Sequence, residues 1–148
     1  MDHNTCEFVE GRLLEIRVAA GYRKVADVDE MIAMIAANVA KLGQDEKFTI
    51  AADWRAVELM PPETAARARE MLARVNPRVV RSSILTLPEH PLTNLQVVRL
   101  IREAENASRR HFISPLEQHA WLSEVLSAAE SARLWTFLGL QGRRPVRG

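Results

Sequence analysis

The chain has 148 residues, 47% hydrophobic and 26% charged, which is typical of one soluble globular domain. Its formal net charge of +1 gives no general attraction for nucleic acid or for an anionic membrane surface. The single cysteine, Cys6, excludes an intramolecular disulfide, and no apolar run approaches the roughly 18 residues of a membrane span. Because the N-terminus also lacks the apolar core of a signal peptide, we expect a cytoplasmic protein.

The first twenty residues predict a β-hairpin. Residues 6–10 and 13–20 have strand patterns with Gly11 near the turn, and we expect this pair at a sheet edge. In the second strand, apolar residues alternate with Glu15 and Arg17. This alternation predicts one buried face and one solvated face.

A helix is predicted next. Asp27 is the expected N-cap, with Glu30 three residues later, and Gly43 closes the helix as a left-handed cap would. Its apolar residues follow helical spacing and predict the buried face: Met31, Ile32, Ile35, Val39 and Leu42.

The central stretch predicts an interior strand followed by a helix. Residues 48–52 form a nearly continuous apolar run, as in a strand covered on both faces, and Asp53 ends it. Pro61 and Pro62 suit the first turn of a helix, where a missing N–H costs nothing. The helix stops at the Asn-Pro pair 76–77, and its predicted buried stripe is Ala65, Ala68, Leu72 and Val75.

The remainder continues the alternation. We expect a strand at 79–87, a helix from Thr93 or Asn94 to about 105, and a short strand at 110–113. Ser114 and Ser127 each begin a capping-box pattern, which predicts two final helices, the second ending near residue 138. The expected buried faces are Leu95, Val98, Ile101 and Ala104 in the first of these three helices, and Ala120, Trp121, Leu122, Val125 and Leu126 in the second.

The predicted order is β-β-α-β-α-β-α-β-α-α, an α/β fold with a mixed, mostly parallel sheet flanked by helices. We expect a single domain over residues 1–140 and a flexible basic tail at 141–148. The C-terminal apolar group is expected mainly to close the core, with part left for a homodimer or partner patch: Leu134, Trp135, Phe137, Leu138 and Leu140.

The passage IAADWRAVELMPPETAARAREML, residues 50–72, resembles the central motif of STAS and SpoIIAA-like domains, the fold of bacterial anti-sigma-factor antagonists. Residues 57–60 match the passage before the family's phosphoacceptor turn, and the resemblance extends over roughly residues 8–126. Where the family has Asp-Ser-Ser-Gly or a relative, this chain has Pro-Pro-Glu-Thr. Glu63 occupies or adjoins the phosphoacceptor position, so the phosphorylation switch is expected to be absent, although Thr64 keeps a hydroxyl beside it.

The resemblance implies a non-catalytic, protein-binding regulatory or scaffolding module of bacterial signalling. Its implied partner-binding residues are Glu58, Met60, Glu63, Thr64 and Arg67. The alternative, also by resemblance, is a lipid or apolar small-molecule module of SEC14-like type. That alternative requires a pocket of several hundred Å³ between sheet and helices.

Motifs for catalysis, metals or cofactors are missing from the sequence. The histidines His3, His90, His111 and His119 lack metal-ligand spacing, and no glycine-rich phosphate loop or nucleophile motif occurs. We expect His111 at a sheet edge, His119 exposed or packed on a helix, and Cys6 as a small buried hydrophobe. The sequence therefore predicts neither an enzyme nor a cofactor.

Two charged groups have competing interpretations. Asp53, Glu58 and Glu63 are candidates for acid-base work at one end of the central strand, but strand termination, solvation and a helix-dipole contact are favoured. A basic cluster is either a face for an acidic partner or phosphate, or a solvated helix face: Arg67, Arg69, Arg74, Arg78 and Arg81. The solvated face is favoured because interleaved aromatic residues are missing.

Overall fold

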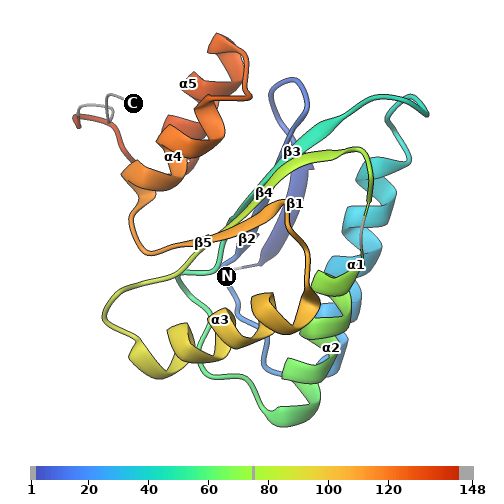
Figure 1. Cartoon of the computed structure of the whole chain (residues 1–148), viewed down its shortest axis with the longest axis vertical. Coiled ribbons are helices and arrows are strands. Elements are labelled where there is room, and N and C mark those ends of the chain that lie inside the picture. The colour runs from blue at the N-terminus through green and yellow to red at the C-terminus, as the bar shows by residue number, and fades with distance from the viewer. Residues whose placement is uncertain (1–2, 75, 144–148) are drawn as a thin grey trace.

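Within residues 3–74 and 76–143, which this computed structural model describes, five strands form one mixed sheet and five helices cover its two faces (Figure 1). The predicted α/β fold and the predicted order of strands and helices are confirmed. The elements are β1 (Asn4–Phe8), β2 (Leu13–Val18), α1 (Val25–Val39), β3 (Phe48–Asp53), α2 (Pro62–Ala73), β4 (Val79–Leu85), α3 (Pro91–Ala104), β5 (Arg109–Phe112), α4 (Pro115–Ser123) and α5 (Ala128–Phe137).

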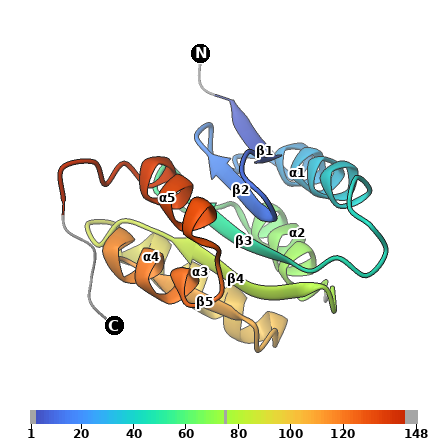
Figure 2. The same ribbon diagram turned by 90° about the horizontal axis from the view of Figure 1, so that it is seen from above.

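The strands lie side by side in sequence order, with β1 and β5 at the edges. β1 is antiparallel to β2 through a turn in which Gly11 has a φ of +57°, and the other neighbours are parallel. Parallel neighbours need crossover connections, and α1, α2 and α3 provide them. Figure 2 shows α4 and α5 on the side of the sheet opposite α1 and α2. The sheet is therefore the middle of three layers.

Each face of the sheet has its own core. On one face, α1, α2 and α3 pack on residues such as Ile16, Ala52 and Ile84. On the other face, α4 and α5 pack on Leu13, Ala51 and other residues of the strands. The C-terminal apolar group closes this second core as predicted, since Leu134, Phe137, Leu138 and Leu140 are buried and Trp135 packs beside them.

The predicted solvated face of the second strand is wrong. The hairpin does lie at the sheet edge, but β1 is the edge strand and β2 is covered on both sides. Glu15 is only 3% exposed, and Arg17 is half-buried against the end of α5. The alternation could not reveal this because α5, the helix that covers Glu15 and Arg17, begins more than a hundred residues later in the chain.

Two predicted helix starts are also corrected. α1 begins at Val25, so Asp27 lies within its first turn, where its carboxylate accepts hydrogen bonds from two preceding backbone amides. α3 begins at Pro91, before both expected caps, because proline fits the first position of a helix. Asn94 instead donates to the Leu87 carbonyl. Ser114 and Ser127 are N-caps as predicted, but the full capping box forms only at Ser127, where the Glu130 side chain also accepts from the N-cap amide.

The predicted faces of α3 and α4 are partly wrong. Leu95 is 68% exposed, and the buried stripe of α3 is Thr93, Val97, Leu100 and Ala104. Both sets have helical spacing, so spacing alone could not choose between them. In α4, Leu122 is buried as predicted, but Val125 follows the helix end and is exposed. The buried residues of α4 are Gln118, His119 and Leu122.

Some expectations fall at the limits of the described residues. Val75, expected in the buried stripe of α2, lies outside them, as do residues 144–148 of the predicted tail. Residues 141–143 form a turn after α5, in which the Arg143 amide donates to the Leu140 carbonyl. Among the residues described, no helix has both the length and the apolar character needed to cross a membrane.

Candidate functional site

An apolar pocket of about 460 Å³ lies between the sheet and the helices α1 and α2. Its floor is formed by β3 and β4, where Ala52 and Ser82 have short side chains. Its roof is formed by α1, whose Ile32, Ile35 and Val39 are only partly buried. These three residues belong to the predicted buried stripe of α1, and they are incompletely buried because they border open space and not only the sheet.

The pocket is apolar and aromatic at one end. Tyr22 and Trp54 both line it, and their rings meet edge to face with centroids 5.3 Å apart. Both residues are 2% exposed. The Tyr22 hydroxyl is buried and has no hydrogen-bond partner among the described residues, and burial raises the pKa of Tyr22 above its ordinary value. A buried hydroxyl without a partner is uncommon and costs free energy.

The other end of the pocket is open and polar. Among its lining residues, Ala36, Ala40 and Arg74 are exposed, so the mouth lies between the last turns of α1 and the end of α2. Asn76 and Asn106 also line this end. Since β3 and β4 begin here, the mouth is at the amino-terminal edge of the parallel strands.

Arg109, the first residue of β5, brings a guanidinium group to this polar end. One terminal nitrogen donates to the carbonyl of Leu72, near the end of α2. The Nε atom is buried and has no hydrogen-bond partner in the described chain. Burial lowers the pKa of Arg109 to about 10, so the side chain stays protonated at neutral pH.

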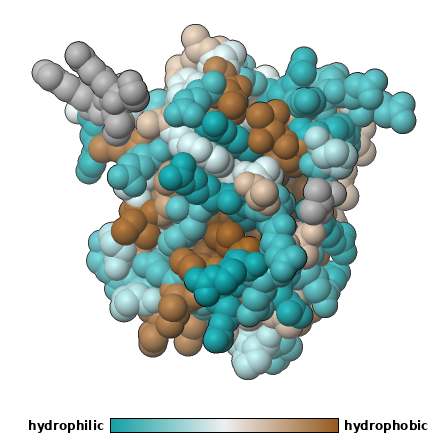
Figure 3. Space-filling view, viewed as in Figure 1, coloured by the Kyte–Doolittle hydropathy of each residue, from teal (hydrophilic) through white to brown (hydrophobic). Residues whose placement is uncertain are grey.

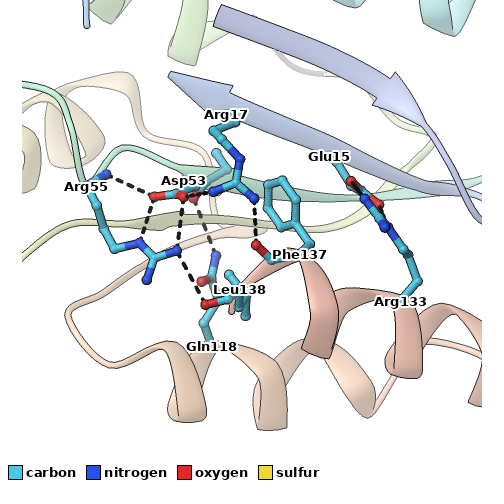
Figure 4. Close-up of polar contacts among 9 residues, drawn as sticks. Glu15, Arg17, Asp53, Arg55, Gln118, Arg133, Phe137 and Leu138 are labelled. Carbon is cyan, nitrogen blue, oxygen red and sulfur yellow. Dashed lines mark hydrogen bonds and ion pairs between the residues drawn. The ribbon is translucent and has the colours of Figure 1, made fainter. Parts of the chain in front are cut away.

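A polar network occupies the opposite face of the sheet, where β2 and β3 meet the end of α5 (Figure 4). Asp53 is 5% exposed, and its carboxylate accepts hydrogen bonds from Arg17 at 2.5 Å and from Arg55 at 3.0 and 3.1 Å. The same arginines donate to the carbonyls of Phe137 and Leu138. The network therefore fastens the end of α5 to the sheet.

Two further contacts extend this attachment. Arg133 of α5 donates to both carboxylate oxygens of Glu15, at 2.6 and 2.8 Å. Gln118 of α4 is fully buried and donates to the Ser83 hydroxyl at 2.9 Å. Figure 4 shows Arg133 meeting Glu15 between α5 and β2, and the partner of Gln118 is on β4, so both contacts are consistent with attachment of the C-terminal helices to the sheet.

Of the two charged groups, the acidic residues are not brought into one site. Asp53 is held by arginines, whereas Glu58 and Glu63 are exposed, and no described hydrogen bond joins either glutamate to Asp53. This arrangement matches the favoured interpretation, in which Asp53 ends the strand.

The arginines of the basic cluster are dispersed. Arg67 pairs with Asp29 and Glu70, Arg69 pairs with Glu103, and Arg81 pairs with Glu124. Arg78 donates to the carbonyl of Gly43, and Arg74 lines the mouth of the apolar pocket. Most of the cluster is therefore engaged with other elements and does not form one uniformly basic face.

The residues implied by the family resemblance are divided between surface and interior. Glu58 and Glu63 are exposed, whereas Met60 is 3% exposed and Thr64 is 1% exposed. The Thr64 hydroxyl is buried without a hydrogen-bond partner in the described chain. Arg67 is partly buried and engaged by two carboxylates, which raise the pKa of its guanidinium. Two acidic side chains therefore remain directly available at this surface.

Exposed leucines adjoin this surface. Leu59 is 56% exposed, and Leu92 and Leu95 of α3 are 67% and 68% exposed. The start of α3 lies against the loop at residues 57–61 because the Gln96 side chain bonds both backbone groups of Met60. Figure 3 shows apolar side chains at the surface over the first turns of α3. A shallow groove beside Leu59 is lined by residues 19–24 and by Glu58.

His111 and His119 each contact other side chains of the fold. His111 lies on the edge strand β5, as predicted, and its Nε2 is 2.7 Å from the Thr86 hydroxyl. Burial lowers the pKa of His111. His119 packs edge to face on Trp135, with centroids 4.9 Å apart. In the described part of the chain, no three His, Cys, Asp or Glu residues are placed to hold a metal ion.

The sequence did not reveal the role of Arg109. It belongs to the run Arg109-Arg110-His111, in which no spacing distinguishes a buried arginine from an exposed one. Arg109 meets the pocket only because β5 lies beside β4, and α2 ends close to its side chain.

Comparisons with protein-family models, with curated proteins and with solved structures found no match to this chain.

Proposed function

We propose that this protein is a non-catalytic module that binds an apolar small molecule in the pocket between α1, α2 and the sheet. The observation that carries the proposal is the combination of about 460 Å³ of space with a largely apolar lining and a few polar groups at its ends. Ligand sites commonly have volumes of roughly 300–1,000 Å³ and this type of lining. The proposal develops the SEC14-like alternative given by the sequence.

Physical chemistry favours an occupied pocket. Apolar side chains around an empty space lose dispersion contacts that a ligand would restore. Each Å² of apolar ligand surface removed from water contributes about 25 cal/mol. A bound ligand would also stabilise the fold, by about 2.7 kcal/mol at a free concentration one hundred times its Kd.

Binding can be tested with N-phenyl-1-naphthylamine, an uncharged apolar probe whose fluorescence rises in apolar surroundings. We expect saturable binding to the purified protein, with one probe per chain. The Ala36→Phe variant places a larger side chain at the exposed mouth and should weaken binding at least tenfold. Ala37→Phe is the matched control, because Ala37 is exposed on the same helix but does not line the pocket.

A second readout does not depend on the probe. Organic extracts of the purified protein should contain an apolar molecule, detected by mass spectrometry, that is depleted from Ala36→Phe and retained in Ala37→Phe. Absence of saturable probe binding, or equal binding by both variants, would reject the pocket as a ligand site.

A second candidate function is protein recognition at the surface implied by the STAS/SpoIIAA resemblance. The observation that favours it is the group of exposed leucines Leu59, Leu92 and Leu95 beside the acidic side chains of Glu58 and Glu63. An apolar patch bordered by acids suits a partner segment with apolar and basic side chains. Because the Thr64 hydroxyl is buried, we propose recognition that does not depend on its phosphorylation.

This second candidate can be tested by affinity capture from a native lysate with quantitative mass spectrometry. A true partner should be lost from the double variant Leu59→Asp, Leu92→Asp and weakened by Glu63→Ala. Val9→Asp is the matched control, since Val9 is 46% exposed and lies at the β1–β2 turn. A capture profile identical for all variants would argue against this surface.

A further inference from the structure

We infer that the ligand of the pocket is an amphipathic acid, whose carboxylate binds Arg109 near the mouth and whose apolar tail extends toward Tyr22 and Trp54. This inference rests on the proposed ligand-binding function and specifies the chemical class of the ligand. It also assigns opposite roles to the two ends of the pocket.

The hydrogen-bonding capacity of Arg109 is only partly used within the described chain. Its guanidinium donates to the Leu72 carbonyl, but its Nε–H is buried with no partner in the described chain. Among residues 3–74 and 76–143, no Asp or Glu forms an ion pair with it. A buried charge is costly unless an opposite charge and hydrogen bonds compensate it.

Arginines on the other face of the sheet are paired with carboxylates. Arg17 and Arg55 share the carboxylate of Asp53, and Arg133 meets that of Glu15 at two points. Arg109 is partly buried like these arginines, but it lines a cavity and meets no carboxylate in the described chain. A ligand carboxylate would supply the missing acceptor, and carboxylates match the geometry of the guanidinium group.

The pocket changes in polarity along its length. Arg74 lines the exposed mouth and adds a second positive charge at the end where Asn76 and Asn106 also lie. The other lining residues are mainly apolar, and Tyr22 and Trp54, which follow the carboxyl ends of β2 and β3, lie at the end of the sheet opposite the mouth. A molecule with one charged end and one long apolar end fits this distribution, whereas a uniformly apolar molecule would leave Arg109 uncompensated.

The test compares dodecanoic acid with dodecanol, which has the same tail and an uncharged head group. Each displaces N-phenyl-1-naphthylamine from the protein at pH 7, below the concentration at which the acid forms micelles. We expect the acid to bind at least about tenfold more tightly than the alcohol, as a buried charge-assisted pair provides. In Arg109→Gln, this preference should disappear while affinity for dodecanol and for the probe is kept.

Arg110→Gln is the matched control, because Arg110 is the next residue and its guanidinium lies over the rings of Phe112 and Trp121 on the other face. Arg109→Lys keeps the charge and should retain part of the preference. If Arg109→Gln fails to fold, the wild-type comparison of acid with alcohol still decides the point. Equal affinity of the wild-type protein for both would overturn the inference, whereas failure of the probe and both ligands to bind would reject the proposed function itself.

Discussion

Arg133 of α5 donates two hydrogen bonds, of 2.6 and 2.8 Å, to the carboxylate of Glu15 in β2. The two residues are 118 positions apart in the sequence. Glu15 is 3% exposed, and this pair raises the pKa of Arg133. The C-terminal helices are therefore attached to the sheet by charges as well as by the apolar residues beneath them.

Removing Arg133 should destabilise the fold. Arg133→Met leaves the carboxylate of Glu15 covered without its partner, and we expect a loss of about 2–3 kcal/mol in the free energy of unfolding. The measurement is urea denaturation at pH 7. Arg69→Met is the matched control, because Arg69 and Glu103 form an exposed pair at 3.7 Å that should contribute less than about 1 kcal/mol. Equal losses in the two variants would show that the buried pair contributes no more to the free energy of unfolding than the exposed pair.

Replacing Asp53 should loosen the C-terminal helices. Asp53→Asn keeps the shape of the side chain but removes the negative charge shared by Arg17 and Arg55. We expect a loss of about 2 kcal/mol or more, and faster amide hydrogen exchange in α4 and α5 than in α1. Asp29→Asn is the control, since Asp29 is half-exposed in its pair with Arg67. Unchanged exchange in α5 would contradict the attachment role.

Glu130 should make part of the stability depend on pH. Burial raises its pKa, but hydrogen bonds from the backbone amides of Ser127 and Arg12 outweigh that effect, so its folded-state pKa lies below the ordinary value of 4.5. The folded state thus favours the charged form. Its contribution is present above about pH 4.5 and is lost as the pH falls through the folded-state pKa.

Glu130→Gln should therefore be less stable than wild type at pH 7, with a difference that shrinks in acid. Urea denaturation from pH 7 to pH 3 measures it. Ser127→Ala removes the other half of the capping box and should cost about 1 kcal/mol. Because Ser127 does not titrate, its effect should change less with pH, and parallel pH curves for the two variants would contradict the assignment to Glu130.

The thiol of Cys6 should be unreactive in the folded protein. The side chain is buried, and burial raises its pKa to about 12. At pH 8 the thiolate fraction is then on the order of one in ten thousand. We expect labelling by Ellman's reagent to be slow in buffer and fast in denaturant, with one thiol released per chain. Fast labelling without denaturant would show that β1 opens readily.

Local signals in the sequence were sufficient for the order of elements. Ser114 and Ser127 cap helices because their hydroxyls meet backbone amides three residues later, a contact that depends only on nearby chain. Likewise, the apolar run of β3 is covered on both faces, as such runs usually are. These features need no knowledge of distant residues.

Features set by distant contacts were not predictable in this way. Glu15 appeared solvated because its partner, Arg133, comes 118 residues later, and Leu95 appeared buried because two helical stripes fitted the same segment. The pocket depends on space left between the strands β3 and β4 and the helices α1 and α2, while its positive charges come from Arg74 at the end of α2 and from Arg109 of β5. Alternation and spacing report which side chains are apolar, but not where packing leaves a gap.

The mouth of the pocket lies where α1 and α2 end, so the partial negative charges of two helix dipoles border it. Ligands of open α/β sheets usually lie beyond the carboxyl ends of the strands. Helices begin there, and their N-termini bind anions favourably. Here the backbone alone disfavours an anion, and the sign of the local potential rests with Arg109 and Arg74. Replacing both arginines with uncharged side chains would leave the scaffold unchanged but shift ligand preference from acids to neutral or cationic molecules. The ligand selectivity of the pocket therefore depends on these two side chains and not on the backbone fold.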